Sequence, residues 1–305
     1  MLVRLVLPIL LLAPALCGQI IPQVRAAIAG KDFALGEKLI AEYKAARGVT
    51  PEMLEALSWL GRGAQAAQQW DKAEGYAGQT RRLALEELKK RPLDAEQNLP
   101  IALGASIEVQ AHMMAARNQR TEAVAFLEQE LAAWKGTSIV TRIQKNVHLL
   151  SLEGTPVPPL EMKEHLGAAP AALSKLKGKP LLLFFWAHWC GDCKYQAPIL
   201  ARLQQEFGAR GLVIVGPTQH YGYVARGVTA GPAEELKYIE EVRRKFYADV
   251  KDMAAPVSED NFRNFGCSTT PTLVLVDRGG TVRLYHPGKM TYEELAPKVS
   301  AVMGS

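Results

Sequence analysis

The sequence predicts an all-α amino-terminal half followed by an α/β carboxyl-terminal half, and three observations lead to this prediction. Residues 19–152 are rich in Ala, Leu and Gln at helical spacing and contain few strand signals. Residues 154–159, Gly-Thr-Pro-Val-Pro-Pro, cannot continue a helix and are predicted to form a linker. Behind them, the apolar run 181–186 shows no alternation, as expected of a strand that is covered on both faces.

Composition sets the class of protein. A chain of 305 residues is long enough for two domains, and 48% hydrophobic with 22% charged residues is typical of a soluble globular protein. The formal net charge of +5 is small for this length, and no block of like charges occurs. The sequence therefore predicts neither a nucleic-acid site nor a polybasic membrane site.

Residues 1–18 have the layout of a secretory signal peptide: one early cation, Arg4, then an apolar core and small residues. Cleavage after Cys17 or Gly18 would release a soluble chain into the periplasm or the medium. Two alternatives stay open, a lipoprotein whose lipidated residue is Cys17 and an uncleaved anchor. Leu16 is larger than lipoprotein processing usually tolerates. Export would place the chain in a compartment where disulfides form.

The helical half shows weak internal repetition. One stretch resembles a tetratricopeptide helical hairpin at Leu57, Leu60, Gly61, Ala64, Trp70 and Ala73. Echoes occur at Gly36 and Ala123, 37 residues before and 50 residues after Ala73, whereas the family repeat is about 34 residues. Pro51 after Thr50 predicts a helix start, and Pro92 and Pro100 predict breaks. This half, residues 19–152, is either a docking surface for a partner or a bundle that only extends the core.

Two cysteines follow the buried strand of the second half, in Trp189-Cys190-Gly191-Asp192-Cys193. They are expected at the junction where the strand passes into a helix. The amino end of a helix offers free N–H groups and the positive end of a dipole, both of which stabilise a thiolate. Because a thiolate attacks disulfides, the spacing predicts a redox pair.

These residues resemble the active-site helix of the thioredoxin superfamily, together with Trp186-Ala187 before them and Ala197-Pro198-Ile199-Leu200 after them. A second match is Ser268-Thr269-Thr270-Pro271-Thr272, and the resemblance spans about residues 154–303. It implies a thioredoxin fold over residues 153–305 with a cis bond before Pro271. Residues 176–180, Leu-Lys-Gly-Lys-Pro, resemble the lead-in of the TlpA-like extracytoplasmic branch.

The resemblance also implies roles for individual residues. Cys190 is expected to be the nucleophile and Cys193 the resolving thiol. The groove that holds the substrate is expected to include Trp189, Gly191, Asp192, Thr270 and Pro271. Thiols and disulfides of proteins would be the substrates, no cofactor is needed, and an unidentified partner would restore the redox state of the pair.

An insertion follows the strand at residues 212–216: a Gly-rich loop that runs to Pro232, then a charged helix over 234–247. Its residues His220, Tyr221 and Tyr223 either border the groove or belong to a surface loop that closes over the helix. Downstream, the pattern predicts a short helix over 260–265, a strand pair over 273–285 and a last helix with a capping box.

Cys267 has two interpretations, a small buried hydrophobe or a third redox thiol. The cysteines do not form the two close pairs of a zinc site, so no metal is predicted. A peroxidase is disfavoured because the Thr-x-x-Cys pattern of that activity is missing. The rival function from another class is a binding scaffold, in which the helical half recruits a partner and the second half turns over little.

The direction of the reaction is predicted from three departures from relatives. Phe184 stands where thioredoxin keeps a buried Asp, Gln196 where TlpA-like reductases often have Glu, and Asp192 where thioredoxin has Pro. A carboxylate near the thiolate disfavours its charge and opposes the helix dipole. The sequence therefore predicts a reductase with a moderately stabilised thiolate.

Overall fold

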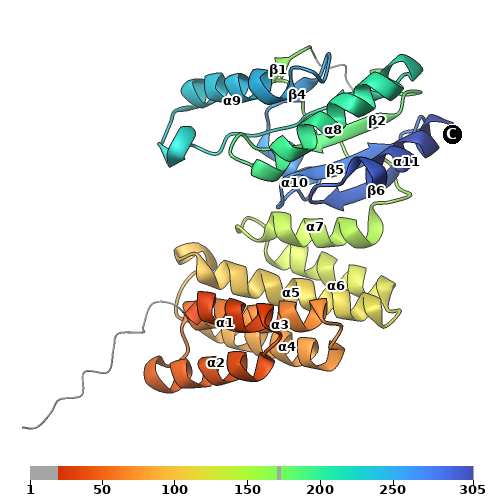
Figure 1. The fold of residues 1–305 in the computed structure, drawn as a ribbon. Coiled ribbons are helices and arrows are strands. Elements are labelled where there is room, and N and C mark those ends of the chain that lie inside the picture. The colour runs from red at the N-terminus through yellow and green to blue at the C-terminus, as the bar shows by residue number, and fades with distance from the viewer. Residues whose placement is uncertain (1–19, 170–172, 305) are drawn as a thin grey trace, which may run out of the picture. The chain divides into compact units, whose positions relative to one another are not determined.

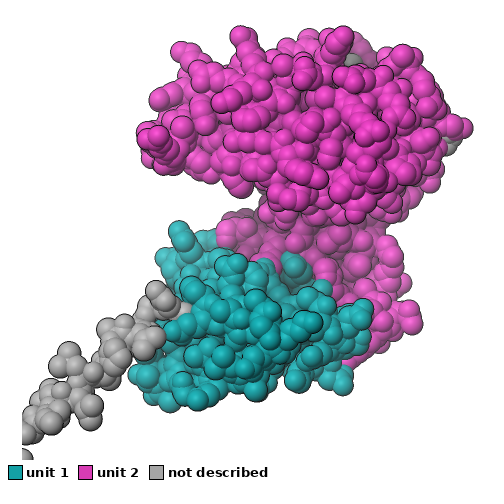
Figure 2. Space-filling model, viewed as in Figure 1, with its two compact units in different colours: residues 1–109 teal, residues 110–305 magenta. Residues whose placement is uncertain are grey.

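The structure, a computed structural model, describes residues 20–169 and 173–304. The predicted signal peptide and the lipid-attachment alternative at Cys17 lie outside these residues. No helix within the described ranges is both long enough and apolar enough to cross a bilayer. The chain divides into two compact units, residues 1–109 and 110–305, which Figure 2 shows in different colours.

The first unit is built from helices that pack in antiparallel pairs. It contains α1 (Ile20–Ala29), α2 (Phe33–Arg47), α3 (Pro51–Ala66), α4 (Trp70–Glu87), a short 3-10 turn (Leu93–Ala95) and the first part of α5 (Asn98–Ala116), which continues across the division. The predicted start of α3 is confirmed: Pro51 is its first residue, and the Thr50 hydroxyl accepts a hydrogen bond from the N–H of Met53 at 3.2 Å.

The turns between paired helices repeat one backbone feature. Lys31, Gln68 and Asn118 each have a positive φ, of 59°, 56° and 63°, the left-handed conformation that ends a helix. Their separations are those of the sequence echoes at Gly36, Ala73 and Ala123. A Cβ at Gly36 would lie 2.7 Å from Cδ2 of Leu60, so a larger residue there would require that side chain to shift. The repeat is therefore structural as well as sequential, and its tetratricopeptide character stays a prediction.

Pro100 does not break a helix, contrary to the prediction. It lies in the first turn of α5, where a missing N–H costs no helical hydrogen bond. The carboxylate of Glu96 caps this helix by accepting hydrogen bonds from the N–H groups of Asn98 and Leu99 at 2.8 and 2.6 Å. The break falls instead around Pro92, which precedes the short 3-10 turn.

The second unit holds the rest of α5, two further helices and a six-stranded sheet with its covering helices (Figure 1). The helices are α6 (Arg120–Ala133), α7 (Val140–Ser151), α8 (Gly191–Phe207), α9 (Pro232–Tyr247), α10 (Glu259–Asn264) and α11 (Tyr292–Met303), with 3-10 turns at Leu173–Leu176, Gly208–Arg210 and Ala225–Gly227. The strands are β1 (His165–Gly167), β2 (Leu181–Phe185), β3 (Val213–Val215), β4 (Ala254–Pro256), β5 (Thr272–Val276) and β6 (Val282–Pro287).

The sheet has the order β1-β4-β3-β2-β5-β6. β2 is parallel to β3 and antiparallel to β5, and β6 lies antiparallel to β5 at the edge. The chain thus follows the predicted arrangement, with α9 as the insertion helix. The capping box of α11 is confirmed at Thr291 and Glu294. The carboxyl-terminal half has the thioredoxin fold that the resemblance implies.

Alternating residues of the central strand β2 pack into two separate hydrophobic cores, one on each face of the sheet. Leu182 and Phe184 of β2 pack with α8, α9 and α11 on one face of the sheet. Leu183 and Phe185 pack on the other face with Phe262 of α10 and with Leu152, which directly follows α7. Complete burial on both faces explains why β2 is an unbroken apolar run.

The last helix of the predicted helical half packs on the second core. His148 of α7 donates a hydrogen bond to the carbonyl of Asn264 at 2.9 Å, and its ring meets the edge of Tyr285. Beyond α7, the predicted linker pairs with the edge of the sheet, since the N–H of Gly154 donates to Val282 O at 2.8 Å. These contacts join α7 to the sheet, and both belong to the compact unit that begins at residue 110. The boundary at 152/153 stays a prediction about which part of the chain folds alone.

The close approach of α7 gives a stability test at Gly266. Its φ is +60°, and a Cβ there would lie 2.5 Å from the backbone nitrogen of Lys145 in α7. We expect Gly266→Ala to lower the free energy of unfolding by about 2 kcal/mol or more, measured by urea denaturation. Gly178→Ala is the matched control, because Gly178 has a φ of +86° and open space around it. It should cost only the backbone strain, about 1 kcal/mol. Equal losses in both variants would contradict close packing of α7.

Candidate functional site

The two cysteines lie at the start of α8, directly beyond the buried strand β2. Cys190 is the N-cap residue, and its Sγ accepts the N–H of Cys193 at 3.0 Å. The two residues form a disulfide in this structure. Cys190 is 4% exposed and Cys193 is fully buried, so an incoming group meets Cys190 first. Gly191, the first residue of α8, is exposed and has open space around it.

The loop before β5 lies against this pair. The bond between Thr270 and Pro271 is cis, which confirms the implied conformation. The carbonyl oxygen of Thr270 lies 3.4 Å from Sγ of Cys190. The loop is held by the Thr272 hydroxyl, which donates to Thr269 O at 2.7 Å. A segment 80 residues away in sequence is thereby brought to the reactive sulfur.

A cavity of about 360 Å³ opens beside the pair. Trp189, half exposed, stands at its border with its ring edge-on to Tyr221 of the insertion. The cavity is lined by Ser138, Thr141, Trp189, Gln219, Tyr221, Glu259, Phe262, Arg263, Cys267, Ser268 and Thr270. Of the groove residues expected from sequence, Trp189 and Thr270 line this cavity, while Gly191 and Asp192 lie on the helix beside it.

A buried carboxylate ties the insertion to the active-site segment. Glu235 of α9 is 1% exposed and accepts hydrogen bonds from the N–H groups of Tyr221 and Gly222 at 2.6 and 3.0 Å. It also contacts His188 Nε2 and His220 Nδ1, each at 3.3 Å. Burial raises the pKa of Glu235, but these hydrogen bonds outweigh it, so the pKa lies below its ordinary value. The group is an anion at neutral pH.

His188, two residues before Cys190, is enclosed by aromatic rings. Those of Tyr221, Tyr223 and Tyr238 meet it edge-on at centroid distances of 5.3 to 5.4 Å. Burial lowers the pKa of His188 although Glu235 opposes the shift. The imidazole is therefore neutral at pH 7 and adds no positive charge near the redox pair. The sequence did not indicate a role for His188, because no second ligand or charged partner lies near it in sequence. Its partner Glu235 comes from α9 and is brought close only by the fold.

The insertion residues His220, Tyr221 and Tyr223 were predicted either to border the groove or to belong to a surface loop, and the structure places them differently. Tyr221 borders the cavity, as the first interpretation expects. His220 bridges Glu235 and Glu164, with Nε2 at 3.3 Å from the Glu164 carboxylate, and Tyr223 packs on His188. These last two hold the loop in place.

Asp192 has a partner that the sequence did not indicate. Its carboxylate accepts a hydrogen bond from Lys289 Nζ at 2.7 Å, and both side chains are about half exposed. Lys289 follows β6, far away in sequence. The sequence predicts that the Asp192 carboxylate disfavours the thiolate, and this prediction needs correction because the ammonium group of Lys289 opposes that effect.

The other two departures lie inside the core next to the pair. Phe184 is fully buried against Tyr247, with ring centroids 5.5 Å apart, so no carboxylate stands there. Gln196 lies one turn beyond Cys193 on the same buried face of α8. Its Oε1 accepts the N–H of Met290 at 2.9 Å, and its Nε2 has no hydrogen-bond partner among the described residues. The resolving thiol therefore lacks a carboxylate at both positions.

Cys267 is buried and is the free thiol of the described chain. Burial raises its pKa well above the ordinary value, so the sulfur stays protonated at neutral pH. Cys267 packs in the core on the side of the sheet that α10 covers, and it also lines the cavity. The first interpretation, a small buried hydrophobe, fits these facts.

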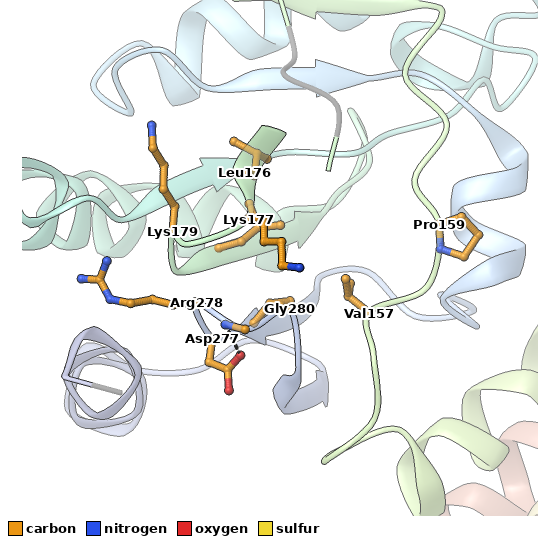
Figure 3. A pocket seen from close by; sticks show the side chains of 11 residues that line it. Val157, Pro159, Leu176, Lys177, Lys179, Asp277, Arg278 and Gly280 are labelled. Carbon is orange, nitrogen blue, oxygen red and sulfur yellow. Dashed lines mark hydrogen bonds between the residues drawn. The ribbon is translucent and has the colours of Figure 1, made fainter. Parts of the chain in front are cut away.

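A second cavity, of about 420 Å³, lies at the other end of the sheet (Figure 3). Its wall includes Leu181, where β2 begins, and the turn at Asp277, so it is remote from Cys190. The polar groups of this turn serve the backbone: the Asp277 carboxylate accepts from Gly279 N, and Arg278 donates to the carbonyl of Gly178 at 3.0 Å. Across residues 20–169 and 173–304, no cluster of metal-ligating side chains occurs.

The carboxyl-terminal half is similar to known thiol-disulfide proteins. Residues 154–285 match the model of the AhpC/TSA family. Thioredoxin-like protein YneN of Bacillus subtilis is 29% identical over 150 residues, which are 48% of this chain and 78% of that protein. Thiol:disulfide interchange protein DsbE of Pseudomonas fluorescens is 26% identical over 154 residues, covering 49% of this chain and 77% of that protein. A solved DsbE-type structure from Chlorobium tepidum is 25% identical and covers 50% of this chain and 98% of that chain, with a TM-score of 0.39.

The buried carboxylate gives a pH-dependent stability prediction. Because the pKa of Glu235 is depressed on folding, its contribution is present above the unfolded value of 4.5 and is lost as the pH falls through the folded value. We expect Glu235→Gln to cost about 2 kcal/mol at pH 7, since two N–H donors lose a charged acceptor. The difference from the unchanged protein should shrink as the pH falls below 4.5.

Urea denaturation at a series of pH values measures this effect. Glu234→Gln is the matched control, because Glu234 is the exposed neighbour on the same helix and should change stability little. A Glu235→Gln deficit that stays constant down to pH 3 would contradict an ionised Glu235.

Proposed function

Since the carboxyl-terminal half is a thiol-disulfide oxidoreductase domain of the thioredoxin-like AhpC/TSA family, we propose that this chain is an exported reductase of protein disulfides. The observation that carries the proposal is the position of Cys190, whose Sγ accepts a helix N-terminal N–H beside a half-exposed Trp189. Export is supported by the layout of residues 1–18.

The reaction proceeds in two exchanges. The Cys190 thiolate attacks one sulfur of the substrate disulfide, so a mixed disulfide forms and the other substrate sulfur leaves as a thiolate. Cys193, one turn along α8, then loses its proton and attacks Sγ of Cys190. The Cys190–Cys193 disulfide forms and the substrate leaves as a dithiol that has gained two electrons. A separate redox partner must return two electrons to the pair.

The reducing direction is proposed because few groups near Cys190 stabilise its thiolate. The Sγ of Cys190 has one backbone N–H donor, from Cys193, while the carbonyl oxygen of Thr270 at 3.4 Å disfavours negative charge. Lys289 is paired with Asp192, and the low pKa of His188 keeps its ring neutral. A moderately stabilised thiolate means a moderately stabilised reduced form, which gives its electrons away readily.

A peroxidase reaction has weaker support than disulfide exchange. The family model includes the name AhpC, but Ala187 stands three residues before Cys190, where the peroxidase pattern has Thr. The Cys190 thiolate therefore has no threonine hydroxyl at the position that the peroxidase pattern requires.

Trapping tests the division of labour between the two cysteines. We expect Cys193→Ser to accumulate covalent adducts with exported proteins, because Cys190 can attack but the intermediate cannot be resolved. Adducts are separated on non-reducing gels and released by dithiothreitol. Cys190→Ser is the control and should trap little, since Cys193 is fully buried. If the two variants trap equally, the assigned roles are wrong. If neither variant traps, the alternative of a binding scaffold is favoured.

The second step gives a further prediction at Gln196. A carboxylate there would keep the hydrogen bond from Met290 N and could accept the proton of Cys193, one turn away. We expect Gln196→Glu to speed resolution of the mixed disulfide about tenfold or more at pH 8, in single-turnover stopped flow. The gain should vanish at low pH, where the buried carboxyl group is protonated.

Gln205→Glu is the control, since Gln205 is exposed near the end of α8. An unchanged resolution rate in Gln196→Glu would mean that proton removal from Cys193 is not the slow step.

A further inference from the structure

The cavity beside the redox pair has a wall that the thioredoxin fold itself does not supply. Ser138, which precedes α7, and Thr141, in its first turn, line the cavity together with Trp189 and Thr270. These first two residues lie in the part of the chain predicted to be a separate helical half. All four belong to the same compact unit, residues 110–305.

This wall is fixed to the loop that carries the cis proline. The N–H of Cys267 donates to Phe262 O at 2.7 Å, and Gly266, just before it, lies against the backbone of α7 at Lys145. The hydroxyl of Tyr285 donates to the carbonyls of Phe265 and Gly266 at 2.8 and 3.1 Å. The ring of His148 in α7 packs on that tyrosine. The α7 wall and the loop that ends at Pro271 therefore share one set of contacts.

The lining of the cavity has the chemistry of a site for an extended polypeptide. It combines hydroxyl groups, the carboxamide of Gln219 and the charged side chains of Glu259 and Arg263 with the rings of Trp189 and Phe262. A peptide main chain needs hydrogen-bond partners along its length, and aromatic walls cover its apolar parts. A small disulfide needs only Cys190. The cavity is continuous with the reactive residue, because Trp189 and Thr270 border both.

We propose that the segment 138–141 is part of the substrate groove and selects an extended, cysteine-bearing polypeptide segment over a small disulfide. The proposal rests on the proposed function, since it names the substrate class of the same site. The helical residues next to α7 thereby act in recognition at the redox centre itself. Thr141 is a specificity-determining residue in this account.

A bulky side chain at Thr141 tests the groove. The substrates are a ten-residue peptide with one cysteine in mixed disulfide with a thionitrobenzoate group, and 2-hydroxyethyl disulfide. We expect Thr141→Trp to lower the ratio of kcat/KM for the peptide to kcat/KM for the small disulfide by about tenfold. Thr121→Trp, a matched change at an exposed position early in α6, should leave that ratio unchanged.

A cross-linking readout does not depend on turnover or on the folding of a groove variant. The Cys193→Ser protein is joined to the same peptide, with a photoreactive benzoylphenylalanine placed two residues from its cysteine. Cross-links to residues 138–141 support the proposal. Adducts whose cross-links all fall elsewhere, or an unchanged substrate ratio in Thr141→Trp, overturn the groove wall while leaving the exchange reaction intact. Failure to form the adduct at all overturns the proposed function and, with it, this inference.

Discussion

The redox half depends on where α8 begins. β2 is buried on both faces, and the chain leaves it at Trp186, whose indole N–H donates to Gly216 O at 2.9 Å. Cys190 then takes the N-cap position and accepts the N–H of Cys193. One hydrogen bond both starts the helix and stabilises a thiolate, because unpaired N–H groups and the positive end of the dipole coincide there. This placement favours Cys190 as the nucleophile.

Three segments that are distant in sequence converge on this helix start and set its electrostatics. The loop at Thr270 brings a carbonyl oxygen to the sulfur, α9 brings the Glu235 carboxylate to His188, and the segment after β6 brings Lys289 to Asp192. Lys289 and Asp192 pair with each other, while the Glu235 anion accepts the N–H groups of Tyr221 and Gly222 beside a neutral His188. The sulfur is thus left mainly with the helix N-terminus as its source of stabilisation, which is the physical basis of the reducing direction that we propose.

Local patterns predicted what local forces determine. The unbroken apolar run predicted β2, and the proline after Thr50 predicted the start of α3. The cis bond at Pro271 was implied by the family resemblance and not by a local pattern alone. The pairing of Lys289 with Asp192 and the burial of His188 could not be predicted, because each needs a partner from 47 or more residues away. Pro100 was misread because a proline in a first turn and a proline that ends a helix look alike in sequence. The cavity wall at Thr141 was missed for the same reason as the ion pair, since packing of α7 on the sheet is non-local.

The redox potential of the pair shows whether a moderately stabilised thiolate makes it a reductant. The protein without residues 1–18 is equilibrated with glutathione buffers, and the fraction with the Cys190–Cys193 disulfide is read by thiol alkylation and mass spectrometry. We expect a potential nearer to about −270 mV, as in thioredoxin, than to about −120 mV, as in a strong oxidant. A potential more positive than about −180 mV would contradict this expectation and indicate an oxidase or isomerase.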